Sequence, residues 1–173
     1  MGAGVGSCMR SQDGVRLVVQ LLDCPWERTG ERMPEGSVAV LASAAEAVNE
    51  VSRSNSAIQQ TVVECSGIAL LATLMTSSAT REEVKAEVAG ALWALSEDSR
   101  IKVDIANAKN IAPLVQLLGS GDERAHHHAS GALLSLGLDN RTNQVQWSMH
   151  VAHGMPSNTA RVPWLPSQRS QRP

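Results

Sequence analysis

The sequence contains three consecutive histidines, His126-His127-His128. Histidine is a common metal ligand, so this run is a candidate metal site. The ligands of one ion must point at the same spot, but successive residues of an α-helix point about 100° apart. No cluster of cysteines or carboxylates adds further ligands. We therefore expect a solvent-exposed helix start here, and the sequence predicts no metal and no cofactor.

The sequence does not indicate a site for nucleophilic catalysis either. The three cysteines, Cys8, Cys24 and Cys65, are odd in number and widely spaced, which favours neither a disulfide framework nor a zinc site. No serine, cysteine, histidine or carboxylate pair stands in a recognisable catalytic pattern. With a net charge of −2, the chain has no general attraction for nucleic acid. The sequence therefore predicts a protein that is not an enzyme.

The glycine-rich start is the remaining chemical candidate. Gly2 occupies the position of a myristoylated glycine, although Gly6 stands where serine or threonine is wanted, and Cys8 could take a second acyl chain. A membrane-targeting adaptor anchored through Gly2 and Cys8 is thus an alternative function. No apolar run reaches the roughly 20 residues that span a bilayer, and no secretory signal is present. We expect a cytoplasmic protein, with the nucleus as the alternative compartment.

The composition indicates which elements hold these residues. The 173 residues include no Phe, no Tyr and four Trp, while 43% are hydrophobic. Such a core is built from Ala, Val, Leu and Ile, which suits helices that pack closely on helices. One all-α domain is the expected fold class, and the composition disfavours an aromatic-rich β-sandwich or barrel.

An internal repeat organises the helices. Three segments share one apolar pattern with i, i+3, i+6, i+7 spacing, which predicts a helical stripe: Gly14 to Leu22, Gly67 to Met75 and Asn110 to Leu118. A second set of segments aligns with offsets of 44 and 41 residues: Ala47 to Val51, Ala91 to Leu95 and Ala132 to Leu136. Both sets fit the period of about 40–47 residues of armadillo or HEAT arrays once a Pro/Gly-rich insertion loop at 23–36 is set aside.

The second set marks the third helix of each unit. On a helical wheel, four apolar residues form the predicted buried face in each unit: Val84, Val88, Leu92 and Leu95, with Val40, Ala44, Val48 and Val51 before them and Ala125, Ala129, Leu133 and Leu136 after them. Trp93 falls on the opposite face with Glu82, Ala86, Ala89 and Glu97. Gly90 and Gly131 indicate close approach by a neighbouring helix. Short helices at 56–65 and 99–108 are expected to begin at N-caps Ser56 and Ser99.

These strings resemble the armadillo-repeat family. The residues that carry the resemblance are Ala89-GALWALSEDSRIKVDIANAKNIAPLVQLL-118 and, more loosely, Ser130-GALLSLGLDNRTNQVQ-146. The resemblance covers residues 14–146, with two complete units and a partial one at each end, and a HEAT-like solenoid is the alternative. It implies a right-handed α-solenoid whose third helices line a concave groove, and a scaffold that binds a protein partner there. The alternative adaptor is similar to acyl-anchored vacuolar armadillo proteins.

The groove residues depart from the family's peptide-binding members, which use a ladder of asparagines. The matching positions hold Glu50, Ala94 and Ser135 in one register, and Arg53, Glu97 and Leu138 in the importin-like register. Recognition would then rest on side-chain contacts. The candidate partner-binding residues are Asn49, Arg53, Trp93, Glu97, His127 and Leu134. Trp93 is the best anchor among them, and packing of Trp93 against the adjacent repeat is the open alternative.

The ends of the array complete the predicted organisation. Residues 1–13 are expected to form a flexible N-terminus and residues 14–146 the repeat domain. Residues 147–173 carry a charge of +3 and four of the seven prolines, so a disordered or aberrant tail is expected. Both ends of the array look uncapped. Solenoid units bury their apolar faces only against neighbours, so the sequence predicts either self-association through these ends or a longer authentic protein.

Overall fold

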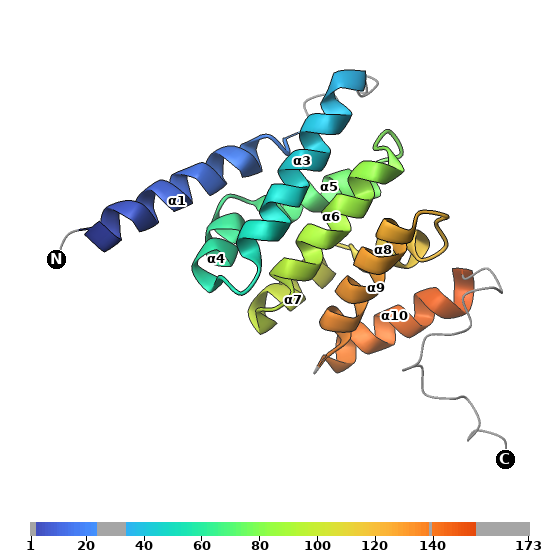
Figure 1. Cartoon of the computed structure of the whole chain (residues 1–173). Helices are drawn as coiled ribbons and strands as arrows, with labels where there is room; N and C mark the ends of the chain where they lie inside the picture. The colour runs from blue at the N-terminus through green and yellow to red at the C-terminus, as the bar shows by residue number, and fades with distance from the viewer. Residues whose placement is uncertain (1–2, 24–33, 139, 155–173) are drawn as a thin grey trace, which may run out of the picture.

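The computed structural model describes residues 3–23, 34–138 and 140–154, and every element in these ranges is a helix (Figure 1). The helices are α1 (Ala3–Gln20), α3 (Glu35–Ser52), α4 (Ser56–Glu64), α5 (Gly67–Thr76), α6 (Glu82–Leu95), α7 (Ser99–Asn107), α8 (Ile111–Leu117), α9 (Glu123–Gly137) and α10 (Arg141–Gly154). The insertion predicted at 23–36 lies largely outside the described residues.

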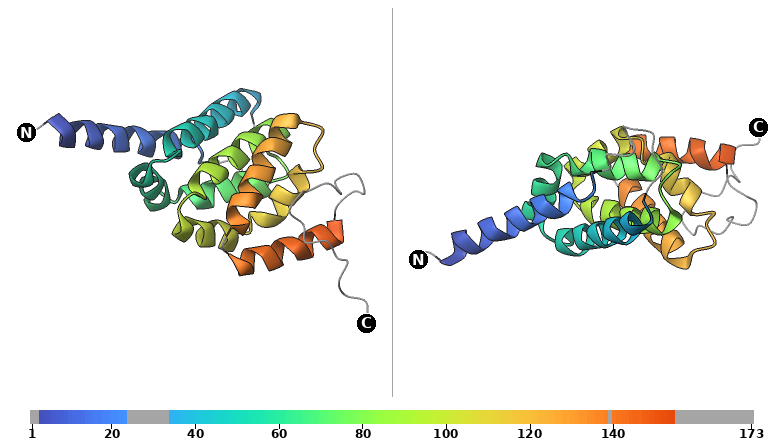
Figure 2. Two further views of the ribbon diagram at one scale, coloured as in Figure 1. Left: turned by 60° about the horizontal axis from the view of Figure 1, so that its bottom comes forward. Right: turned by 90° about the horizontal axis from the view of Figure 1, so that it is seen from above.

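The helices form a stack of similar units. Helices α4, α5 and α6 make one three-helix unit, and α7, α8 and α9 make the next. The third helices α3, α6 and α9 lie side by side in chain order (Figures 1 and 2). Helix α1 contacts α3 and α4 at one end, and its N-terminal half projects away from the stack, while α10 packs on α8 and α9 at the other end. The predicted period is therefore seen as a repeated arrangement in space.

Turns and caps repeat with the helices. The turns between the first two helices of each unit pass through Ser66 and Lys109, whose φ angles of 59° and 62° reverse the chain sharply. The N-caps of α4 and α7 are Asn55 and Asp98, whose side chains accept from the backbone N–H groups of Ile58 and Arg100. The predicted caps Ser56 and Ser99 were wrong by one residue, because the preceding Asn and Asp side chains supply the acceptor that bonds the helix N–H.

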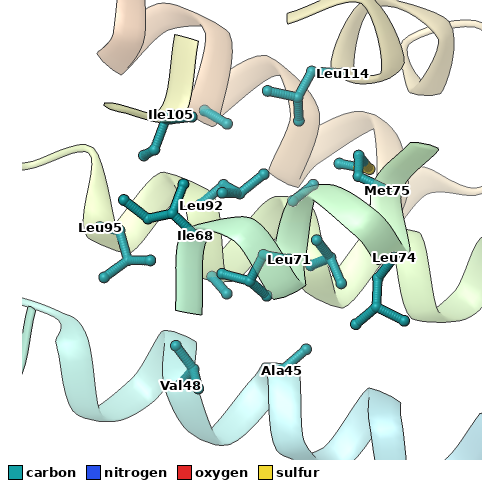
Figure 3. Close-up of a cluster of buried hydrophobic side chains, with 14 of the residues drawn as sticks. Ala45, Val48, Ile68, Leu71, Leu74, Met75, Leu92, Leu95, Ile105 and Leu114 are labelled. Carbon is teal, nitrogen blue, oxygen red and sulfur yellow. The ribbon is translucent and has the colours of Figure 1, made fainter. Parts of the chain in front are cut away.

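The core lies between the three layers of each unit. All four predicted core positions of α6 and of α9 are buried, as are Ala44 and Val48 in α3. Figure 3 shows part of this core, where side chains of α3, α5 and α6 meet. Two predictions were wrong: Val40 and Val51 of α3 are 48% and 43% exposed. Their equivalents lie in α6 and α9, each of which packs on a preceding third helix, whereas no third helix precedes α3 among the described residues.

The face of α6 that carries Trp93 is also largely covered. Ala86 and Ala89 share it and are both buried, because α6 has a third helix on either side. A central helix of the stack therefore presents only a narrow strip to solvent, which the single-helix wheel does not indicate.

Two helices run past the predicted domain boundaries. Helix α1 begins at Ala3, inside the segment expected to be flexible, and α10 continues past Gln146 to Gly154. Gly14 does not interrupt α1, since one glycine costs a helix only about 1 kcal/mol. Residues 155–173 lie outside the described residues, and the tail and domain boundaries stay predictions.

No single helix among the described residues is both long enough and apolar enough to cross a membrane. Helices α4 and α5 pass that test only as a pair, which is bent by 73°, and only by length and composition.

Candidate binding face

The three third helices form one continuous surface, here called the third-helix face. Glycines allow the helices to approach closely there. A Cβ atom added to Gly90 would lie 2.9 Å from Asn49 Nδ2, and one added to Gly131 would lie 2.6 Å from Trp93 Cδ2. The predicted close approach at Gly90 and Gly131 is confirmed. Their missing side chains make room for Asn49 and Trp93 to reach across to the next helix.

Trp93 stands at the centre of this face and is half-buried. Its indole packs on Gly131 of α9, and the His127 ring meets it edge-on with a centroid separation of 5.4 Å. The Arg53 guanidinium carbon lies 5.8 Å from the ring centroid, within cation–π distance. Three of the predicted residues are thus brought together around one ring: Arg53 just after α3, Trp93 of α6 and His127 of α9.

Replacing Gly131 with alanine is expected to lower the free energy of unfolding by about 1–3 kcal/mol, because the new methyl group would collide with a packed indole. Thermal or chemical denaturation measures the loss. Gly14→Ala is the matched control, since that site in α1 has no atom within 4 Å of the added Cβ. It should gain up to about 1 kcal/mol from helix propensity. Equal stability of the two variants would show that Trp93 moves aside without cost.

Arg53 is held in place by a buried partner. Asn49 lies one helical turn earlier, is only 3% exposed and accepts a hydrogen bond at Oδ1 from Arg53 Nε over 3.2 Å. Glu50 approaches the same nitrogen at 3.7 Å from the exposed side. Asn49 was predicted to face a partner, but its burial leaves it to orient Arg53. Within the described structure the two Nη atoms of Arg53 have no hydrogen-bond acceptor, so they can bond a ligand.

Glu97 lies just beyond the end of α6 and links two units. Its carboxylate accepts the backbone N–H of Ser54 at 2.8 Å, in the turn that follows α3. The buried Gln59 amide donates to the carbonyls of Ser52 at 2.9 Å and Ala94 at 3.1 Å. These bonds satisfy the last carbonyls of two helices and fix the turn beside Arg53. Glu97 remains exposed, so its second carboxylate oxygen can face a ligand.

The remaining candidates lie on α9. His127 is exposed beside Trp93, whereas His128 points inward and places Nδ1 2.9 Å from the Ala86 carbonyl. The run of histidines diverges, and in the part of the chain that the structure describes no three His, Cys, Asp or Glu side chains could hold a metal ion. Leu134 is 42% exposed at the outer edge of α9, away from the other candidates on α3.

Sequence reasoning missed two buried polar residues that shape this face. Glu87 of α6 is almost fully buried and pairs with Arg124 of α9, and Gln59 joins α4 to α3 and α6. The helical pattern does not predict burial of either residue, because charged and amide side chains in a helix are expected to face solvent. The predicted acylation sites are not tested by the geometry: Gly2 lies outside the described residues, and the Cys8 side chain in α1 is not described.

The comparisons with known proteins identify the fold. No family model and no curated protein matches the sequence. Among solved structures, the chain is similar to a designed armadillo repeat protein, YIII(Dq)4CqI, with 19% sequence identity and a TM-score of 0.65. It is also similar to computationally designed armadillo repeat proteins for modular peptide recognition, with 20% identity and a TM-score of 0.62.

Both likenesses cover 80% of this chain and 53% of the other, so the chain spans about half the length of the structures it matches. At this level of identity, the likeness concerns how the backbone is folded. It agrees with the repeated three-helix units and with the order of α3, α6 and α9 described above. The chain has the fold of an armadillo-repeat array, an all-α solenoid.

Proposed function

We propose that this chain is a non-enzymatic scaffold that binds a protein segment along the third-helix face. The observation that carries the proposal is the cluster of Arg53, Trp93 and His127, which joins three successive units at a partly exposed aromatic ring. Aromatic and arginine side chains are the commonest anchors of protein interfaces. One of the similar solved structures was designed for modular peptide recognition, which supports the same use of this fold.

Binding would proceed through side chains. Asn49 is buried and already bonded to Arg53, so it cannot pair with the backbone of an extended peptide. The exposed or partly exposed groups that remain are the Arg53 guanidinium, the Trp93 ring, the His127 ring and the Glu97 carboxylate. Because hydrogen bonds at Asn49 and Ser54 hold Arg53 and Glu97 in place, a ligand would lose less side-chain entropy on binding them.

A selection from a library of displayed peptides tests the proposal. Peptides selected on the wild-type chain should bind the double variant Arg53→Ala, His127→Ala about tenfold more weakly, since both residues line the face and neither is buried. We prefer these residues to Trp93, whose packing on Gly131 makes Trp93→Ala lose stability as well as binding.

The matched control is Val103→Ala with Lys109→Ala, two exposed positions at α7 and the turn after it. These substitutions should leave binding unchanged. If every selected peptide bound the face variant as tightly as the wild type and lost affinity for the control variant, the binding surface would lie on the other side of the stack and the proposal would be wrong.

A further inference from the structure

Third helices pack on one another twice within the chain, α3 on α6 and α6 on α9. Helix α3 has an exposed surface equivalent to the one that α6 and α9 bury against the preceding third helix. We define the entry stripe as Val40, Ala47 and Val51, which lie within about 40° of one another on the helical wheel. The equivalent stripes are fully buried in the next two third helices: Val84, Ala91 and Leu95 in α6, and Ala125, Ala132 and Leu136 in α9. In α3 the two valines are 48% and 43% exposed.

The exposure extends to the turn that follows α1. Leu21 is the repeat equivalent of Leu74 and of Leu117, which are both buried, yet Leu21 is 53% exposed. Figure 3 shows what covers the inner positions: Leu74 of α5 and Leu95 of α6 lie on the side of their unit that faces Ala45 and Val48 of α3. Leu21 and Val51 both belong to the first unit and are 53% and 43% exposed, and the described residues include no third helix before α3.

The last third helix presents the complementary half of this interface. We define the exit stripe as Ser130 and Leu134 of α9, which are equivalent to Ala45 and Asn49 of α3 and to Ala89 and Trp93 of α6. Asn49 is buried where α6 packs on it, and Trp93 is half-buried under α9. Leu134 is 42% exposed, because α10 packs on α8 and α9 without covering this side chain.

We propose that two copies of this chain associate head to tail, with the exit stripe of one copy on the entry stripe of the other. The contact would continue the packing of α3 on α6 and of α6 on α9, in which equivalent positions meet, Asn49 against Gly90 and Trp93 against Gly131. Because the two stripes differ, the interface is heterologous. Further copies can then add to the free stripe at each end, and the assembly stays open.

One residue sets the strength of this contact. Glu46 of α3 is exposed at the position that Gly90 and Gly131 occupy in α6 and α9, where the absent side chain admits Asn49 and Trp93. In the proposed complex, Leu134 of the second copy would meet Glu46 where Trp93 meets Gly131 within the chain. The Glu46 side chain would hold the two helices farther apart than α6 and α9 are at Gly131. The association is therefore weaker than the internal contacts and depends on protein concentration.

Sedimentation equilibrium of the full chain over a range of concentrations tests the proposal. The wild-type chain should form dimers and larger species. Val51→Glu should block only the entry stripe and Leu134→Glu only the exit stripe, so each variant alone should associate at least about tenfold more weakly. An equimolar mixture of the two variants should recover dimers, because one free stripe of each kind remains, but no larger species.

Glu46→Gly should strengthen wild-type association, and Val103→Glu on α7, also an exposed valine, should leave it unchanged. Circular dichroism melts check that each variant stays folded, as expected for exposed positions. Dimers that persist in Leu134→Glu alone would show a symmetric contact between entry stripes and overturn the proposal. A wild-type chain that stays monomeric at its highest soluble concentration, with Glu46→Gly also monomeric, would overturn it too and leave the stripe to another protein.

Discussion

Leu74→Ala is expected to lower the free energy of unfolding by about 3–5 kcal/mol, whereas Leu21→Ala should cost less than about 1 kcal/mol. The two leucines occupy the same position in successive repeats. Leu74 is fully buried between α5 and α3 (Figure 3), and Leu21 is 53% exposed. Truncating Leu74 removes buried methyl groups and leaves a cavity that the rigid neighbouring helices cannot close, and truncating Leu21 leaves none.

Urea denaturation of the two variants beside the wild-type chain measures the difference. The comparison is controlled for residue type, for the size of the change and for repeat position. Burial is then the main difference between Leu74, inside α5, and Leu21, in the turn that follows α1. Equal losses would mean that Leu21 is covered in solution, by a second copy or another segment. Measurement at two protein concentrations separates these cases, because only a covering copy makes the loss depend on concentration.

The repeat and the inner core could be predicted from the sequence because both depend on local periodicity. A stripe such as Val84, Val88, Leu92 and Leu95 is recorded in the spacing of apolar residues, and all four are buried. Gly90 and Gly131 likewise indicate close packing from the sequence alone, and both are in close contact with a neighbouring helix. Each of these inferences uses one helix at a time, which is sufficient in the middle of the array because each inner unit has a similar unit on either side.

The ends and the binding face could not be predicted in this way, since they depend on which helix lies alongside. Val51 has the same pattern as Leu95 but no preceding third helix, so it is exposed. Asn49 and Trp93 occupy equivalent positions, yet Asn49 is buried and orients Arg53, while the larger indole packs over Gly131 and stays partly exposed. These differences arise from side-chain size and from the neighbouring unit, which the periodic pattern does not record.

The ion pair between Glu87 and Arg124 joins α6 to α9, and the periodic pattern of apolar residues did not predict it. The Glu87 side chain is only 7% exposed, while that of Arg124 is 67% exposed. A carboxylate removed from water this far needs its charged partner, because an unpaired buried charge costs several kcal/mol. The value of Arg124 to the fold is therefore chiefly the cost of leaving Glu87 unpaired.

Arg124→Ala is accordingly expected to lower the free energy of unfolding by about 2–3 kcal/mol. Chemical denaturation at neutral pH measures the loss. Arg100→Ala is the matched control: its side chain is 91% exposed and lies 3.9 Å from Asp98, so its removal should cost less than about 1 kcal/mol. The double variant Glu87→Met, Arg124→Met should recover most of the loss, since it removes both charges and keeps the volume of the contact. If Arg124→Ala cost no more than Arg100→Ala, water or another cation would be reaching the Glu87 carboxylate, and the close packing of α6 on α9 at this point would be looser than the structure indicates.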